Sequence, residues 1–162
     1  MKSIVRRDRW GIAHVDSPNA PAAFEAQGWI AASDRIWQMD SDRLKALGRW
    51  GEIVGPKGLK EDAFFRRLGL GKAAQDDWAA LSPETRHMTE SYAAGVNGWL
   101  KENFQNLPAE YAHHPAPPEP WEPWHCVAVY KVRHIFMGVF ESKGWRAGMG
   151  RDMGAKAARR LF

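Results

Sequence analysis

The pattern of apolar and polar positions predicts a mainly helical chain, and its clearest helix falls between positions 28 and 51. This stretch reads GWIAASDRIWQMDSDRLKALGRWG. At 3.6 residues per turn, a broad apolar arc covers Trp29, Ile36, Trp37, Met39, Leu44 and Leu47. A narrow polar stripe opposite holds Asp34, Gln38, Asp42, Lys45 and Arg49. The pattern predicts an amphipathic helix with a wide buried face, and Gly48 lies where such a helix can end.

Two charged residues, Asp40 and Arg43, break this pattern because they point into the apolar arc. They are three positions apart, so they can pair along a helix. A buried charge without a partner costs several kcal/mol, and we therefore expect these side chains to bond to each other or to nearby backbone. The pair is interpreted as a structural ion pair in a core, and the alternative is a support for a nearby active site.

The remaining elements follow from local signals. Short β-type runs on either side of Asp8–Gly11 predict a hairpin, with Gly11 free to take positive φ. Ser82 and Pro83 form a typical helix start. Further helices are expected over 20–27, 61–70, 72–81, 82–101 and 124–138, and Gly28 is either a break after the first of these or a point of close packing. We also expect a glycine-rich loop over 51–59, a proline-stiffened loop over 107–121, and a short basic helix over 155–162. We predict a single domain over 1–162, made of a strand or hairpin at 1–16, a helical body at 17–140 and a C-terminal tail at 141–162.

Composition narrows the classes of protein. The chain has 162 residues, nine of them Trp, which indicates extensive contacts with other surfaces. The net charge of +4 is spread along the chain apart from a basic C-terminal end, so nucleic acid is not an expected partner. A membrane is not expected either, because no apolar run is long enough to span a bilayer. The single Cys126 excludes an intrachain disulfide and is interpreted as a buried structural thiol. The start MKSIVRRD lacks an apolar signal core, which predicts a cytoplasmic protein if Met1 is native, and a periplasmic or secreted one if a leader was removed.

Several blocks together carry a family resemblance. They read S-D-R-I-W-Q-M-D-x-x-R from Ser33, G-W-I-A-A-S-D-R from Gly28, D-x-x-x-R-x-L-G-L from Asp62, Y-x-x-G-V-N-x-W-L from Tyr92, and L-P-x-E-Y from Leu107 followed by a P-W pair at Pro120. In this order they resemble the penicillin acylase (penicillin amidase) family of N-terminal-nucleophile hydrolases, over about residues 4–138.

The resemblance implies an αββα heterodimer that autoproteolysis produces from one inactive precursor, in which this chain is the small α subunit. Its tail, 141–162, would lie near the processing site. The implied reaction is hydrolysis of an N-acyl amide through an acyl-enzyme on the N-terminal Ser of a larger β subunit, whose own α-amino group is the base. No catalytic residue is therefore expected on this chain.

The same resemblance places part of the acyl pocket late in the chain, around Arg133, His134, Met137, Gly138 and Phe140. Arg133, His134 and Lys143 depart from a purely apolar pocket, and we expect them to favour a dicarboxylic acyl group such as succinyl or glutaryl. The alternative is that Arg133 and Lys143 face solvent. No cofactor is expected to be required, although the family allows a structural calcium ion, for which Glu141 is the nearest carboxylate.

Other readings remain open. An acyl-homoserine-lactone acylase would share the fold with a deeper alkyl pocket, and a non-enzymatic helical binding module would use the Trp-rich face alone. His14 is expected to hydrogen-bond within the hairpin, and its alternative role is a catalytic base. His113 and His114 are interpreted as a surface loop, because no further Cys or His gives a metal-ligand spacing.

Overall fold

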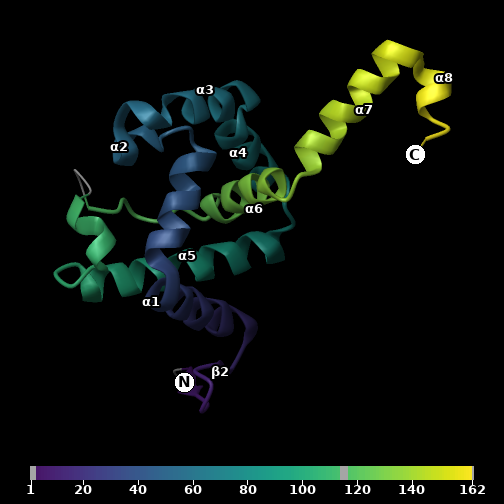
Figure 1. The fold of residues 1–162 in the computed structure, drawn as a ribbon. Helices are drawn as coiled ribbons and strands as arrows, with labels where there is room; N and C mark the ends of the chain where they lie inside the picture. The colour runs from purple at the N-terminus through teal and green to yellow at the C-terminus, as the bar shows by residue number, and fades with distance from the viewer. Residues whose placement is uncertain (1–2, 114–116, 162) are drawn as a thin grey trace.

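The computed structural model describes residues 3–113 and 117–161, although the side chains of His113, Val139 and Phe140 lie outside this description. A hairpin precedes a helical body and a helical C-terminal arm (Figure 1), which confirms the predicted fold class. The elements are β1 (Ile4–Arg7), β2 (Ala13–Asp16), α1 (Ala20–Ala46), α2 (Gly51–Val54), η1 (Gly55–Gly58), α3 (Leu59–Leu68), α4 (Leu70–Ala80), α5 (Pro83–Asn103), η2 (Ala109–His113), α6 (His125–Phe136), α7 (Val139–Met153) and α8 (Ala155–Ala158).

The hairpin forms where the sequence predicts it. Strands β1 and β2 are antiparallel, and Val5 pairs with Val15. The Asp8 carboxylate accepts hydrogen bonds from the backbone N–H groups of Trp10 (2.8 Å) and Ile12 (3.0 Å), while Gly11 takes φ +78°. All four residues of β1 are exposed. The turn is therefore fixed locally, while the strands bury little of their apolar surface.

Helix α1 begins at Ala20 and continues through Gly28, so the predicted helices over 20–27 and 28–51 belong to one element. Asn19 caps it by accepting from the backbone N–H of Ala22 at 2.9 Å, and the only non-helical residue inside is Arg35, at a kink. The helix ends at Ala46, followed by Gly48 at φ +63°, as its position suggested. Gly28 does not break the helix, because it is a point of close packing.

Helices α1 and α5 cross in backbone contact, and this crossing organises the body (Figure 1). A Cβ added at Gly28 would lie 2.0 Å from the carbonyl oxygen of Tyr92. A Cβ added at Gly95 would lie 1.9 Å from the carbonyl oxygen of Glu25. Because both distances are far below contact, only glycine fits at these two positions without moving a backbone.

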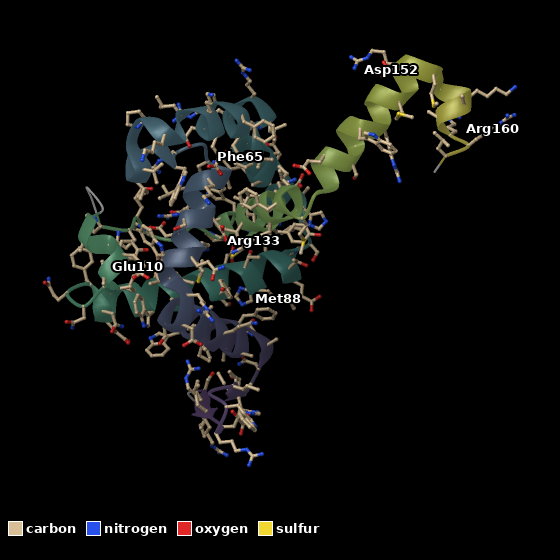
Figure 2. All side chains as sticks on the ribbon, viewed as in Figure 1. Phe65, Met88, Glu110, Arg133, Asp152 and Arg160 are labelled. Carbon is tan, nitrogen blue, oxygen red and sulfur yellow. The ribbon has the colours of Figure 1, made fainter. Side chains whose placement is uncertain are left out.

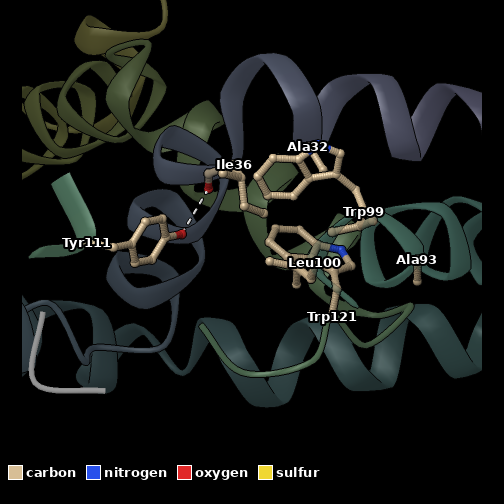
Figure 3. Packing of buried hydrophobic residues seen from close by; sticks show 8 residues of the cluster. Ala32, Ile36, Ala93, Trp99, Leu100, Tyr111 and Trp121 are labelled. Atoms are coloured by element: carbon tan, nitrogen blue, oxygen red, sulfur yellow. Dashed lines mark hydrogen bonds between the residues drawn. The ribbon is translucent and has the colours of Figure 1, made fainter. Parts of the chain in front are cut away.

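Two apolar clusters fill the body. Figure 3 shows part of the first, in which side chains of α1 and α5 pack with Tyr111 and Trp121 from the following loop. The second joins α1, α3, α4 and α6 through Ala46, Phe65, Leu70, Ala74, Ala128 and Val132. The loop is held by Asn97, whose side chain donates to Trp121 O (2.9 Å) and accepts from Trp121 N (2.7 Å). This confirms that Asn97 needs a partner inside its apolar helix.

Two glycine-rich segments are more ordered than expected. The predicted loop over 51–59 is instead α2, η1 and the start of α3, because the buried Asp62 carboxylate accepts from the N–H groups of Trp50 (2.7 Å) and Gly51 (2.8 Å) and fixes the entry to α2. Helix also extends through the C-terminal tail, where only 155–162 was expected to be helical. Gly138, at φ +80°, lets the chain turn from α6 into α7, which extends away from the body (Figure 1).

Candidate functional site

The residues predicted to bind substrate lie where α6 ends, turns at Gly138 and begins α7. The N–H of Met137 bonds to Arg133 O at 3.0 Å and that of Gly138 to Ile135 O at 3.1 Å, which closes α6. Gly138 then accepts the left-handed conformation that a residue with a side chain rarely adopts. The predicted set is therefore brought together by one helix end and one glycine turn.

Arg133 is bound to the body rather than free. Its Nη2 lies 2.5 Å from Asp42 Oδ2, and the Arg133 side chain is 45% exposed while that of Asp42 is 11% exposed. Asp42 was expected on the polar stripe of α1, and it is buried because α6 packs over that part of the stripe. The ion pair holds the guanidinium at the surface in a fixed place, with part of it open to solvent.

A cavity of about 310 Å³ lies beside this turn, between α3 and the end of α6. Its apolar lining includes Phe64, Phe65, Ile135 and Phe136, and its rim includes Glu61, Gly138 and Glu141. The rings of Phe65 and Phe136 meet edge to face, with centroids 5.8 Å apart, and Figure 2 labels Phe65 above Arg133. Sequence reasoning missed this aromatic wall, because no local signal connects α3 with a helix about 70 residues later.

The other predicted residues lie around the cavity rather than in it. Met137 is 76% exposed, and the His134 ring lies against that of Tyr130, with centroids 4.8 Å apart. Among the predicted substrate-binding residues, Gly138 is the one that lines this cavity within the described part of the chain. Phe140 belongs to α7, but its side chain lies outside the described residues. Lys143 is exposed on α7.

A buried polar network joins α1 to the loop before α6. Arg43 Nη2 lies 2.5 Å from Asp40 Oδ1, and both side chains are almost fully buried. Arg43 Nη1 donates to the carbonyl oxygens of Glu119 (3.1 Å) and Pro120 (3.2 Å), and Tyr111 donates to Asp40 Oδ2 at 3.1 Å. Burial, followed by the nearby Asp40 charge, raises the pKa of Tyr111. The network therefore fastens α1 to the loop that leads into α6.

His125 begins α6 beside this network and is held neutral. Its Nδ1 accepts from the backbone N–H of Glu122 at 2.9 Å, and its ring packs against Trp121 and Trp124. Burial, reinforced by the positive charge of Arg43, lowers the pKa of His125 to about 3. Arg49 donates two hydrogen bonds to the Glu119 carboxylate, each of 2.8 Å. This pairing is the main cause that lowers the pKa of Glu119. These groups position the loop before α6.

Among the described residues, the carboxylates nearest the turn at Gly138 are too few to hold a metal ion by themselves. Glu141 and Glu61 both reach the rim of the cavity beside Gly138. Within residues 3–113 and 117–161, however, no group of three His, Cys, Asp or Glu side chains is placed to hold a metal. A hard cation such as calcium takes six or more oxygen ligands. The residues described here do not by themselves fit the calcium site that the resemblance allows.

The other candidate chemistry is local. His14 Nε2 lies 3.2 Å from Asp8 Oδ2 in the hairpin turn, so it hydrogen-bonds where expected, with its ring mostly exposed. His114 lies outside the described residues, as does the side chain of His113.

Cys126 is half-buried in a second, separate cavity, and burial raises the pKa of its thiol. In the part of the chain that is described, no helix combines the length and the apolar character that crossing a membrane requires.

The comparisons with known proteins agree along almost the whole chain. The family model described as penicillin amidase matches residues 3–162. The penicillin acylase 2 proenzyme of Pseudomonas sp. (strain SE83) is 42% identical over 142 residues, which are 88% of this chain and 18% of that protein. The acyl-homoserine lactone acylase QuiP of Pseudomonas aeruginosa is 35% identical over 135 residues, which are 83% of this chain and 16% of that protein.

A solved structure extends the comparison to the fold. The chain superposes on a thermostable penicillin G acylase from Alcaligenes faecalis with a TM-score of 0.76 and 26% identity, covering 99% of this chain and 88% of that chain. The chain spans less than a fifth of the length of the relatives named above, at 18% and 16%. Sequence family, order of elements and superposition thus agree: the chain belongs to the penicillin amidase family.

Proposed function

We propose that this chain is the smaller subunit of an amide hydrolase that is made as a precursor and cleaves N-acyl amides. The observation that carries the proposal is the family match over residues 3–162, joined to coverage of 88% of a penicillin G acylase chain. The relative from Pseudomonas sp. (strain SE83) is named a proenzyme, which supports processing from a longer precursor, with the tail at 141–162 near the cleavage point.

In this proposal the larger β subunit supplies the chemistry. Its N-terminal Ser attacks the amide carbonyl while the α-amino group of that Ser takes the hydroxyl proton. The C–N bond then breaks and the departing amine receives this proton. Water finally hydrolyses the acyl-enzyme ester, which releases the carboxylic acid and restores the Ser hydroxyl. This chain contributes no catalytic group. It supplies one wall of the acyl pocket, made by the aromatic cavity of Phe65 and Phe136 and by the residues around Gly138.

The experiment is expression of the full-length precursor, followed by denaturing intact-mass measurement and an amidase assay. We expect two polypeptides, the larger of which begins with Ser, and hydrolysis of N-acyl amides. A single unprocessed, inactive species that is soluble and monodisperse would contradict the proposal and favour a helical binding module.

We propose further that the pocket prefers an acyl group with a terminal carboxylate. Asp42 fixes the partly exposed guanidinium of Arg133, and His134 and Lys143 are exposed on the same turn or on the following helix. A preoriented guanidinium binds a carboxylate well because little side-chain entropy is lost on binding. A charge-assisted hydrogen bond of this kind contributes about 1.5–3 kcal/mol, or about 10- to 100-fold in affinity.

The matched test is the double variant Arg133→Gln/Asp42→Asn, because it removes both charges and leaves no buried carboxylate unpaired. We expect kcat/KM for a glutaryl amide to fall by about 10- to 100-fold while that for a hexanoyl amide changes little. Equal losses on both acyl groups would contradict the preference without affecting the proposed hydrolase activity.

An acyl-homoserine-lactone acylase is the second candidate, favoured by the 35% identity to a relative of that name. The assay that separates the two compares a long-chain acyl-homoserine lactone with the glutaryl amide on the same preparation. A higher kcat/KM for the lactone, unaffected by the Arg133→Gln/Asp42→Asn change, would establish the second candidate.

A further inference from the structure

Lys45, on the last turn of α1, contacts aromatic rings instead of a carboxylate. The polar stripe of α1 predicted that it faces solvent, but it is half-buried. Its ammonium nitrogen lies 4.7 Å from the ring centroid of Trp50 and 5.5 Å from that of Phe136. Both distances fall within the range of about 6 Å over which a ring face attracts a cation. Asp42, one turn earlier, binds Arg133, and within residues 3–113 and 117–161 no carboxylate lies within ion-pair distance of Lys45.

The Phe136 ring that Lys45 contacts also lines the cavity beside Gly138. Phe136 is the last residue of α6 and is 47% exposed. The Lys45 ammonium lies over the face of its ring, and the Phe65 ring is inclined at 85° to it with centroids 5.8 Å apart. A side chain that is nearly half exposed at a helix end has few packing neighbours to select one rotamer. The Lys45 contact therefore contributes to the orientation of this wall of the cavity.

The contact between α1 and α6 fixes both parts of the candidate site. Asp42 and Lys45 are three positions apart on α1, as are Arg133 and Phe136 on α6, and residues at this spacing are neighbours on a helix surface. Asp42 binds Arg133, and Lys45 contacts Phe136. Successive side chains of α1 thus hold the guanidinium and the aromatic wall.

We propose that Lys45 is a positioning residue for acyl specificity, which acts by holding the Phe136 ring where the apolar stem of an acyl group packs against it. The inference rests on the proposed function and deepens it, because it concerns the same cavity. Lys45 does not itself line the cavity. Since the ring would contact the acyl stem and not the amide bond that is cleaved, loss of its orientation should weaken substrate binding and leave the chemical step unchanged.

Three substitutions in the full-length, processed protein test the inference. Lys45→Met keeps an unbranched stem of similar length and removes the charge. Lys45→Arg keeps a cation that attracts ring faces at least as well. The matched control is Lys60→Met, which removes an exposed positive charge on α3, next to the cavity residue Glu61. Each variant is assayed with a hexanoyl amide and with an acetyl amide of the same amine, because the acetyl group has no stem to pack against the ring.

We expect Lys45→Met to raise KM for the hexanoyl amide by about 3- to 30-fold, the range for a partly desolvated cation–π contact. Its kcat, and both constants for the acetyl amide, should change by less than about twofold. Lys45→Arg should restore KM, and Lys60→Met should leave it unchanged. A general structural defect would lower kcat for both substrates at unchanged KM, and that result would overturn the inference.

A second test leaves Lys45 in place and changes the ring. Trifluorophenylalanine at position 136 keeps the shape of the ring but withdraws electrons from its face, which weakens its attraction for a cation. We expect a rise in KM for the hexanoyl amide close to that of Lys45→Met, and less than about a twofold further rise when both changes are combined. Multiplied effects of the two changes would show that Lys45 does not act through Phe136.

The outcomes separate this inference from the proposed function. If the wild-type protein is processed and hydrolyses N-acyl amides, but Lys45→Met behaves like Lys60→Met, only the role of Lys45 fails. If the wild-type protein is neither processed nor active, the proposed function fails and the role of Lys45 fails with it.

Discussion

The crossing of α1 and α5 and the arm formed by α7 and α8 are opposite kinds of helical structure. At the crossing, glycine brings backbone against backbone, and buried aromatic side chains fill the space around it. In the arm, a Cβ added at Gly144, Gly148 or Gly150 would meet nothing within 4 Å. Trp145 and Met153 are 56% and 44% exposed. The same residue type thus has opposite roles, set by what packs against it.

The difference shows which helices of this chain are stabilised by packing against other parts of the same chain. Helix stability in proteins comes mostly from tertiary packing of an apolar face, which the body has and the arm largely lacks within this chain. Helix α7 contacts α6, and α8 packs on α7. We therefore expect changes in the body to alter the free energy of unfolding strongly, and matched changes in the arm to alter it weakly or in the opposite direction.

The largest effect is expected at the buried ion pair. Asp40→Asn leaves Arg43 charged and buried without its counter-charge, which costs about 3–5 kcal/mol of unfolding free energy. The matched change in the arm, Asp152→Asn, affects an exposed pair with Arg151 at 3.7 Å and should alter stability by less than about 0.5 kcal/mol. Urea unfolding followed by tryptophan fluorescence measures both, and similar losses would contradict the comparison.

The next effect is expected at the helix crossing. Gly95→Ala places a Cβ 1.9 Å from Glu25 O, and backbone atoms cannot give way as a flexible side chain can. The helices must separate, and we expect a loss of about 3 kcal/mol, the upper end of the usual range for overpacking. Differential scanning calorimetry of the full-length protein measures it. An unchanged melting temperature would show that the crossing is looser than described.

A smaller effect is expected from pH at His125. Its pKa of about 3 in the folded protein lies below the ordinary 6.5, so between these values the unfolded chain binds more protons than the folded one. This contribution to stability is complete above about pH 6.5 and falls by at most about 1.4 kcal/mol per pH unit on acidification.

The His125→Asn variant keeps an acceptor near the position of Nδ1 and cannot titrate. We expect the difference in unfolding free energy between wild type and variant to shrink as the pH falls from 7 to 4. A difference that stays constant over this range would mean that folding does not shift the pKa of His125.

The smallest effect, of opposite sign, is expected in the arm. Gly144→Ala adds a Cβ to an exposed helix interior where nothing lies within 4 Å, so the change should stabilise α7 by about 0.5–1 kcal/mol. Hydrogen exchange of the α7 amides measures this local gain. Faster exchange in the variant would indicate that Gly144 contacts something outside the described residues.

Local signals predicted local structure well. The hairpin turn at Asp8–Gly11 and the cap at Ser82, which accepts from Thr85 N at 3.2 Å, were both expected from neighbouring residue types. Local reasoning failed where a distant contact overrides it. At Gly28 the sequence left a helix break and a point of close packing as alternatives, and only the carbonyl of Tyr92, which packs there, decides between them. The loop after Gly51 proved helical because Asp62, eleven residues later, caps it.

For the candidate site, too, some features could be predicted from the sequence and others depend on contacts between distant segments. Family motifs placed Arg133, His134, Met137, Gly138 and Phe140 near the end of one helix, and their part in substrate binding stays a prediction. No local pattern could give the pairing of Arg133 with Asp42 or the ring contact of Phe65 with Phe136, since each joins segments far apart in the chain. Polar periodicity in α1 even suggested that Asp42 faces solvent.

By itself, the sequence determined the family, the hairpin, most of the helices and the pairing of Asp40 with Arg43, because these depend on residue order and on spacing within a few turns. The tertiary structure alone decided which glycines are indispensable and that Asp42 is buried. It also decided where the apolar surface stays uncovered. The physical reason is that burial and close contact depend on what the rest of the chain places opposite a residue, and periodicity along one helix does not contain that information.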